Sequence, residues 1–151
     1  DRGDIVVFKG PGNWLNEEQV EPRPFRRAGE FVGILPPRGE GHLVKRVIGL
    51  GGDKVVCCDR SGRITVNGIP LDEQEYLLQD AKPSLLPFNV VVPAGHLWVM
   101  GDNRAESADS RAHMGGPGGG FVPVDNGVGP ACCVIWSSDR MSMVRPPETV
   151  R

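Results

Sequence analysis

Residues 43–59 read LVKRVIGLGGDKVVCCD and carry the clearest secondary-structure signal in the chain. They contain two runs rich in valine and isoleucine, at 43–50 and 54–59, separated by Gly-Gly-Asp at 51–53. Short β-branched runs bounded by glycine are typical of strands joined by tight turns. The stretch therefore predicts two strands, and the rest of the chain can be compared with that pattern.

Similar runs lie on both sides of this stretch, at 5–9, 63–67, 89–92, 96–100, 121–124 and 128–136. The chain also has 21 glycines and 14 prolines among 151 residues, which disfavours a helical bundle and suits many short strands. Residues 24–35 place apolar side chains at helical spacing between flanking prolines. The sequence predicts a mainly β fold of antiparallel sheets, with one short helix near 24–35 and long loops.

A chain of this length is about one domain. We expect a single β-rich domain over residues 1–140, in which 56–88 could form a small inserted subdomain, and a disordered tail at 141–151. The chain opens directly on a strand pattern, without an initiator methionine, a signal peptide or an apolar run of about 18 residues. We therefore expect this chain to be a piece of a longer protein. The piece itself is expected to contain no membrane span.

The charge balance argues against one class of partner. The net charge is −2, from 17 lysines and arginines against 19 aspartates and glutamates, and the isoelectric point is near 5.9. Proteins that bind nucleic acids usually carry a basic excess or a clustered basic face. We expect no nucleic-acid partner.

The 4 cysteines form two adjacent pairs, Cys57-Cys58 and Cys132-Cys133. Three interpretations stay open. A metal site is disfavoured, because adjacent strand residues point to opposite faces. A cross-strand disulfide between the pairs requires an oxidising compartment. Small buried thiols that fill the core are the third interpretation.

Two adjacent cations interrupt the apolar run 43–50. Side chains alternate along a strand, so Lys45 shares a face with Leu43 and Val47, while Arg46 lies on the other face. A charge among apolar neighbours is costly unless it is paired or neutralised. Arg46 cannot lose its proton and needs a carboxylate partner, whereas a desolvated Lys45 can become a general base. A lysine that extends to solvent from a strand edge is the simpler interpretation.

The polar loop 101–111, GDNRAESADSR, directly follows the apolar run 96–100. Its carboxylates, guanidiniums and hydroxyls can hold one another through charge-assisted hydrogen bonds. Loops positioned by a core strand often carry functional residues. The alternatives are a solvated turn or a calcium loop, and the acidic residues miss the spacing of the latter.

In this order, three segments resemble bacterial type I signal peptidases. Residues 3–8 match the family's G-D-[IV]-V-x-F, and residues 101–111 match G-D-N-R-x-x-S-x-D-S-R at every fixed position. Residues 45–53 match K-R-x-x-G-x-P-G-D except that Gly51 replaces the usual proline. The resemblance runs from Gly3 to about Trp136. The family's serine-bearing S-M-x-P-T segment is absent from the sequence, so we expect this chain to lack the nucleophile and to be inactive by itself.

The resemblance implies an endopeptidase that removes signal peptides from secreted preproteins by a Ser–Lys dyad, with no metal or other cofactor. In this scheme Lys45 is the general base, and Ser107 hydrogen-bonds to the lysine amine and orients it.

The resemblance also implies supporting roles around the base. Asp102 is expected to pair with Arg46, and Asp109 with Arg111, which would make the loop rigid. The residues just before Lys45 are expected to border the groove in which the substrate adds as an extended strand, and to favour small residues at the cleavage site. They are His42, Leu43 and Val44.

By the same resemblance the parent protein is held in the cell membrane by an N-terminal anchor, with this domain on the extracytoplasmic side. The expected partners are secretory preproteins with small residues before the cleavage site, and the membrane lipid surface. Trp14, in a glycine-rich stretch, is expected to be exposed, where it could contact lipid.

Other functions stay open. A self-cleaving SOS-type repressor domain also uses a Ser–Lys dyad on a β fold, but lacks the motif found here at 101–111. A non-catalytic β interaction domain would be a signal-peptidase relative that lost its serine, and the sequence upstream of Asp1 would distinguish it. A nucleophile within this chain, Ser107 or Ser110, conflicts with the supporting role that the motif gives to Ser107.

Overall fold

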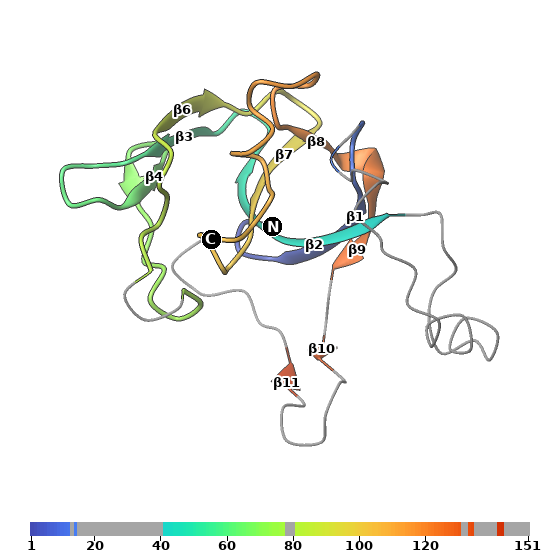
Figure 1. Ribbon diagram of the computed structural model, residues 1–151, viewed down its shortest axis with the longest axis horizontal. Coiled ribbons are helices and arrows are strands. Elements are labelled where there is room, and N and C mark those ends of the chain that lie inside the picture. Colours follow the sequence, from blue (N-terminus) through green and yellow to red (C-terminus); the bar gives the residue numbers. More distant parts are fainter. Residues whose placement is uncertain (13, 15–40, 78–80, 131–132, 135–141, 144–151) are drawn as a thin grey trace.

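The computed structural model contains a five-stranded and a four-stranded antiparallel sheet and a short two-stranded ladder (Figure 1). The structure describes residues 1–12, 14, 41–77, 81–130, 133–134 and 142–143. The strands are β1 (Ile5–Lys9), β2 (His42–Leu50), β3 (Lys54–Cys57), β4 (Ile64–Val66), β5 (Ile69–Pro70), β6 (Phe88–Val91), β7 (His96–Met100), β8 (Val122–Pro123), β9 (Gly127–Pro130), β10 (Cys133–Val134) and β11 (Ser142–Met143). A short 3-10 helix, η2, spans Val124–Asn126. The prediction of a mainly β, antiparallel fold is confirmed, and the predicted helix at 24–35 lies outside the described residues.

The longest strand, β2, lies in the middle of the five-stranded sheet, whose order is β8-β7-β2-β1-β9. Val6 of β1 lies opposite Lys45, and Met100 of β7 lies opposite Arg46. The pairing of β7 with β2 shifts register between Val47 and Gly49. The two predicted cations therefore lie in the centre of the sheet.

The four-stranded sheet, in the order β5-β4-β3-β6, is built from residues 54–91 and includes most of the segment predicted as an insertion. Apolar side chains from this sheet, such as Val55 and Ile64, form one buried cluster with Ile48, Trp98 and Met100 of the five-stranded sheet. The two sheets thus share a hydrophobic core, and burial of such side chains is the main favourable term in folding.

A second buried cluster covers the other side of the five-stranded sheet and includes Trp14. The Trp14 ring is 8% exposed, meets Phe8 edge-on at 6.0 Å and stacks on His113 at 4.3 Å between ring centroids. The expectation that Trp14 is exposed to lipid is therefore wrong. Its ring covers apolar surface of β1 instead, which removes both rings from water.

The structure joins the first pair of adjacent cysteines. Cys57 and Cys58 form a disulfide with each other across a cis peptide bond, with their Cα atoms 2.9 Å apart. This disulfide between neighbours replaces all three interpretations offered for Cys57 and Cys58: a metal site, a disulfide to the other pair, and free thiols.

Part of the predicted disordered tail forms a strand. Ser142–Met143 pairs with Cys133–Val134, and the other residues of 141–151 lie outside the described residues.

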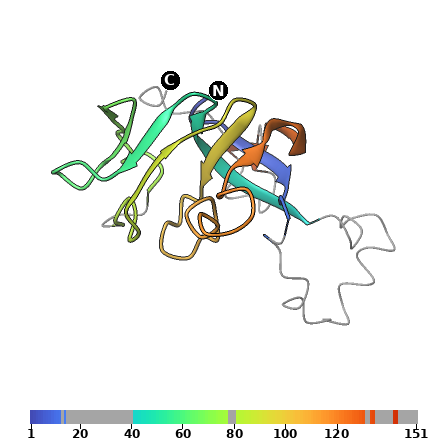
Figure 2. The same ribbon diagram turned by 90° about the horizontal axis from the view of Figure 1, so that it is seen from above.

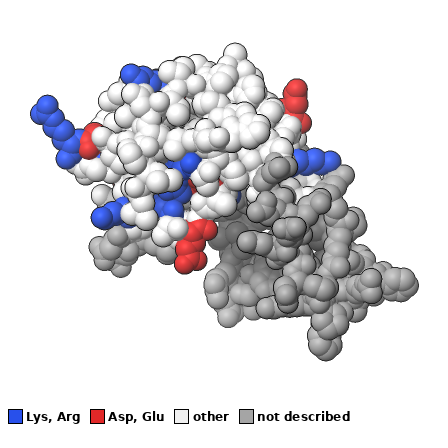
Figure 3. All heavy atoms as spheres, turned by 45° about the horizontal axis from the view of Figure 1, so that its top comes forward, with Lys and Arg blue, Asp and Glu red and all other residues white. Residues whose placement is uncertain are grey.

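On the face shown in Figure 3, the lysines and arginines lie in separate groups among uncharged atoms. Several arginines are instead buried and paired with carboxylates, including Arg46, Arg104 and Arg111. These buried pairs hold the site described below.

Asp53 joins three parts of the chain. Its buried carboxylate accepts hydrogen bonds from Arg2 Nε and Nη2 at 2.8 and 2.7 Å, from the backbone N of Leu50 at 2.8 Å, and from Asn67 Nδ2 at 2.9 Å. The bonds from Arg2, with those from Leu50 and Asn67, outweigh the effect of burial and lower the pKa of Asp53 to about 2. The ionised carboxylate therefore stabilises the turns around β2 and β3.

We expect Asp53→Asn to lower the free energy of unfolding by about 2 kcal/mol at pH 7, since about two pKa units separate the folded and unfolded states. A depressed pKa stabilises the fold above the unfolded value near 4, and this stabilisation is lost as the pH falls towards 2. Urea unfolding at pH 7 and pH 3 would measure the difference. Asp125→Asn, at an exposed aspartate of η2, is the control with little expected effect. If Asp53→Asn lowers the free energy of unfolding by the same amount at pH 7 and at pH 3, the lowered pKa of Asp53 is not the source of its stabilising effect.

Candidate active site

The loop after β7 folds back onto the strand that it leaves. Ser110 Oγ accepts a hydrogen bond from the backbone N of Val99 at 2.9 Å, and the backbone N of Ser110 donates to the carbonyl of Val99 at 3.2 Å. Figure 2 shows the loop, in gold and orange, coiled beside the end of β7. Because β7 is the neighbour of β2, this fold-back brings residues 101–111 to the part of β2 that carries the two cations.

A buried ion pair makes the loop rigid. Arg111 Nη2 lies 2.7 Å from Asp109 Oδ2, and the Asp109 side chain is 0% exposed. Asp109 Oδ2 also accepts a hydrogen bond from the backbone N of Gly101 at 2.9 Å. Burial alone would raise the pKa of Asp109, but the hydrogen bonds from Arg111 and Gly101 outweigh it, so the pKa lies below its ordinary value. Asp109 is therefore ionised and joins both ends of the loop.

The second predicted pair is also present. Arg46 donates from Nε and Nη2 to the two carboxylate oxygens of Asp102, at 2.8 and 2.7 Å, and from Nη1 to the carbonyl of Gly3 at 2.8 Å. Such a two-pronged contact has a fixed geometry. It holds the start of the loop against β2 and gives buried Arg46 the carboxylate that it needs.

The loop brings Ser107 to Lys45. Lys45 Nζ donates a hydrogen bond to Ser107 Oγ at 2.7 Å, across 62 residues of sequence. The lysine is half-buried, and this burial lowers its pKa. The negative charge of Asp109 opposes the shift, and the positive charge of Arg111 adds to it. The arrangement provides an amine that loses its proton more readily than a lysine in water, beside a hydroxyl that fixes its direction.

Because Gly101 has no side chain, Ser107 can occupy the space beside it and contact Lys45. A Cβ atom at Gly101 would lie 2.2 Å from Ser107 Oγ and 2.6 Å from Ser107 Cβ. Both distances are far inside ordinary van der Waals contact. The glycine at this fixed position of the motif is thus a steric requirement of the Lys45–Ser107 pair.

The structure separates the three residues predicted to border a groove. Leu43 is half-buried and lies on the Lys45 face of β2, whereas Val44 points to the opposite face and is 56% exposed. His42 is exposed and shares the face of Val44 by strand alternation. Among the described strands, β1 pairs with β2 along 42–46 and β7 pairs with it from Arg46 onward.

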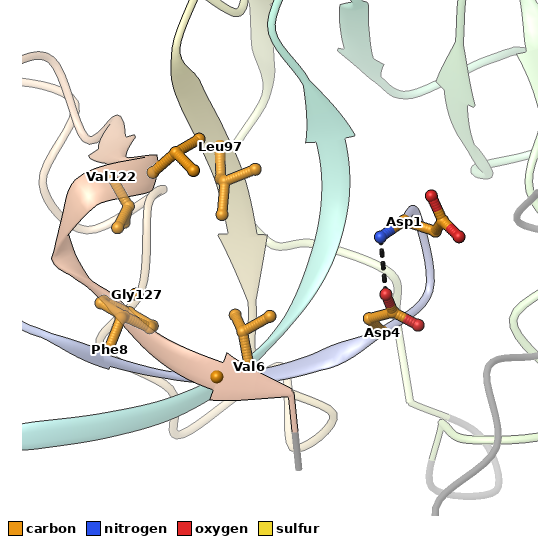
Figure 4. Close-up of a pocket in the computed structure, with 9 residues that line it drawn as sticks. Asp1, Asp4, Val6, Phe8, Leu97, Val122 and Gly127 are labelled. Carbon is orange, nitrogen blue, oxygen red and sulfur yellow. Dashed lines mark hydrogen bonds and ion pairs between the residues drawn. The ribbon is translucent and has the colours of Figure 1, made fainter. Parts of the chain in front are cut away.

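A cavity of about 390 Å³ lies on the Lys45 side of the sheet (Figure 4). Val6, Leu97 and Val122 point into it, and Asp1 and Asp4 lie at its rim, joined by an ion pair. Val6 is the cross-strand partner of Lys45, whereas Lys45 and Ser107 are not among the residues that line the cavity. Its walls are largely apolar.

Three residues near the site were not singled out from the sequence. Arg104 of the loop forms a buried ion pair with Glu73, and the partly buried Tyr76 donates a hydrogen bond to Glu73. Arg104 is a fixed residue of the motif at 101–111, which is a signal that could have identified it. Nothing in the local pattern around Glu73 or Tyr76 indicates a contact with the loop.

Residues 1–136 match the family model described as signal peptidase, peptidase S26. The chain belongs to this family. Signal peptidase I of Mycobacterium tuberculosis is 42% identical over 95% of this chain and 54% of that protein. The probable signal peptidase I of Mycobacterium leprae is 41% identical, over 91% of this chain and 56% of that protein.

The chain thus spans little more than half the length of these signal peptidase relatives. A solved structure of a signal peptidase I from Enterococcus faecalis has the same fold, with a TM-score of 0.53 and 23% identity over 87% of this chain and 95% of that one. In the described part of the chain, no helix is long and apolar enough to cross a membrane. The same residues contain no group of three histidine, cysteine or acidic side chains suited to a metal ion.

Proposed function

We propose that this chain is the catalytic part of a serine endopeptidase that removes signal peptides from secreted preproteins, with Lys45 as its general base. The observation that carries the proposal is the 2.7 Å contact of the half-buried Lys45 amine with Ser107 Oγ. A lysine serves as an effective base near neutral pH when its pKa is lowered, and burial is the main cause of the lowered pKa of Lys45. Membership of the signal peptidase family supports the choice of substrate class.

The proposed reaction uses a serine supplied from outside residues 1–151. Its hydroxyl attacks the carbonyl carbon of the scissile bond while neutral Lys45 takes the hydroxyl proton. The resulting ammonium returns that proton to the leaving amine nitrogen, and an ester joins the serine to the cleaved signal peptide. Water then attacks the ester with Lys45 again accepting a proton, which releases the signal peptide as a free acid and restores the serine.

Ser107 holds the lone pair of Lys45 towards the incoming hydroxyl, since its own Oγ occupies one hydrogen-bonding direction of the amine. The two ion pairs, Arg46–Asp102 and Asp109–Arg111, keep the loop and β2 in this relation. Such preorganisation lowers the barrier because the groups do not have to be ordered during the reaction.

We further propose that the preprotein binds as an extended strand beside Leu43–Lys45, where backbone hydrogen bonds supply affinity and side-chain pockets supply specificity. In this proposal the largely apolar cavity next to Val6 takes a small or apolar residue of the substrate. The site of action is the extracytoplasmic face of the cell membrane, where a membrane anchor would bring the enzyme to the lipid surface and to its substrates.

The test is to fuse a family S-M-x-P-T segment to the N-terminus of residues 1–151 and to incubate it with a preprotein that has an Ala-x-Ala cleavage site. We expect the fusion to cleave after the second alanine, as read by gel shift and mass spectrometry of the products. Replacing the serine of the added segment by alanine should abolish cleavage.

Two outcomes would contradict the proposal. Cleavage by residues 1–151 alone would place the nucleophile within this chain, at Ser107 or Ser110. Binding of the preprotein by the fusion without any turnover would instead indicate a non-catalytic interaction domain. The first outcome is checked directly with Ser107→Ala and Ser110→Ala.

A further inference from the structure

The connector between β5 and β6 contributes a buried cluster beneath the loop that carries Ser107. Arg104 Nη2 lies 2.5 Å from Glu73 Oε1, and the two side chains are 2% and 4% exposed. Tyr76 Oη donates a second hydrogen bond to Glu73 Oε1 at 2.8 Å. The Glu73 carboxylate therefore fixes the plane of the Arg104 guanidinium, because Tyr76 holds the carboxylate in turn.

Arg104 in turn holds Gly101, the residue that lies against Ser107. Its Nε donates to the carbonyl of Gly101 at 3.0 Å, and its Nη1 donates to the carbonyl of Pro83 at 2.8 Å. The carbonyl of Arg104 accepts a hydrogen bond from Arg111 Nη2 at 2.9 Å. Gly101 is thus held through its carbonyl by Arg104 and through its N–H by Asp109.

Tyr76 also reaches the strand that carries the lysine. The guanidinium carbon of Arg46 lies 4.2 Å from the centroid of the Tyr76 ring, within the range of a cation–π contact. Arg46 is the neighbour of Lys45 and is bound to Asp102 at the start of the loop. The connector therefore contacts both elements that hold the Lys45–Ser107 pair, β2 through Arg46 and the loop through Arg104.

We propose that Glu73 and Tyr76 are positioning residues that keep Lys45 Nζ and Ser107 Oγ at hydrogen-bonding distance by holding Arg104 and Arg46. A purely structural role would be served as well by apolar side chains, because replacing a buried ion pair with well-packed apolar residues is often neutral for stability. Apolar replacements would, however, lose the directional hydrogen bond from Arg104 to the carbonyl of Gly101. The catalytic consequence rests on the proposed function, whereas the effect on Lys45 itself does not.

The test measures the pKa of Lys45 directly, by NMR titration of residues 1–151 with isotope-labelled lysines, the signal being assigned by its loss in Lys45→Met. Tyr76→Phe removes one hydrogen bond and keeps the ring over Arg46. The double variant Glu73→Leu/Arg104→Met removes the ion pair and leaves the net charge unchanged. We expect the pKa of Lys45 to rise in both, by about one unit in the double variant, as water reaches the amine.

Arg2→Met is the matched control, because it removes a guanidinium from a bidentate carboxylate pair away from the loop. Its melting temperature should fall while the pKa of Lys45 stays unchanged. In the fusion enzyme, the acid limb of the kcat profile of Tyr76→Phe should move to higher pH with KM unchanged. Loss of stability alone would not move that limb.

An unchanged pKa of Lys45 in folded Tyr76→Phe and in the folded double variant would overturn the proposal. If the double variant does not fold, Tyr76→Phe decides the matter. Cleavage by the wild-type fusion together with unmoved pKa values would remove the positioning role and leave the proposed function standing. A raised pKa in the variants of a fusion that cleaves nothing would support the positioning role and remove the proposed function.

Discussion

Lys45→Met is expected to lower kcat of the fusion enzyme by at least about 10³-fold, because the substitution removes the group that takes and returns the proton. Methionine has nearly the same length and fills the same half-buried space, so the fold should survive. The measurement is the initial rate of preprotein cleavage at saturating substrate. A wild-type rate in this variant would end the proposal of a Ser–Lys dyad.

The same substitution should raise the melting temperature at pH 7. Burial lowers the pKa of Lys45, so folding is penalised wherever the unfolded lysine binds its proton more tightly than the folded one. The penalty is fully present below the folded pKa and disappears as the pH rises through the ordinary value of 10.5. The gain in melting temperature should therefore be larger at pH 7 than above pH 10.

Lys54→Met is the control for both measurements, since Lys54 is an exposed lysine on β3, the next strand along the chain. It should leave kcat unchanged and show no gain that depends on pH. If Lys45→Met lowers the melting temperature at pH 7 and raises it at pH 10, the amine is stabilised by charge rather than desolvated, and its role as a base loses its physical ground.

Gly101→Ala is expected to lower kcat by about 10²-fold, the usual cost of misplacing a reacting group by about 1 Å. The new Cβ would stand 2.6 Å from Ser107 Cβ, so Ser107 must shift and its 2.7 Å contact with Lys45 is disturbed. The backbone of Gly101 cannot retreat instead, because Asp109 and Arg104 hold its N–H and its carbonyl. The forced contact should also lower the free energy of unfolding by about 1–3 kcal/mol.

Two further variants separate the steric cause from the catalytic effect. Gly115→Ala places a methyl group where nothing lies within 4 Å, in the polar segment that continues from the same loop, and should change neither kcat nor stability. Gly101→Ala/Ser107→Gly removes the clash, so stability should return while kcat stays low. Wild-type kcat in Gly101→Ala would show that the Lys45–Ser107 contact is not needed for turnover.

The sequence was sufficient for features that depend on local pattern and on single chemical needs. Strand alternation predicted β2 and the opposite faces of Lys45 and Arg46, and strand β1 was predicted at its observed bounds. Arg46 must find a carboxylate when it is buried, and Asp102 supplies one. The motif at 101–111 was enough to indicate the family.

Other expectations failed where the outcome depends on what packs nearby. Trp14 was expected at the surface because it lies in a glycine-rich stretch, but its ring packs against Phe8 and His113. The cysteine pairs left three interpretations open, and the observed pairing of Cys57 with Cys58 was not among them. Neither outcome follows from the spacing of residue types.

Residue patterns along the chain predicted most of the strands, and the family resemblance implied the two ion pairs and the lysine proposed as the base. Only the tertiary structure decided that Gly101 abuts Ser107, and that Glu73 lies beneath a loop 31 residues further along. The physical reason is that side-chain contacts depend on how separate segments pack in three dimensions. A glutamate whose partner is an arginine of another segment has the same local sequence as a glutamate in water.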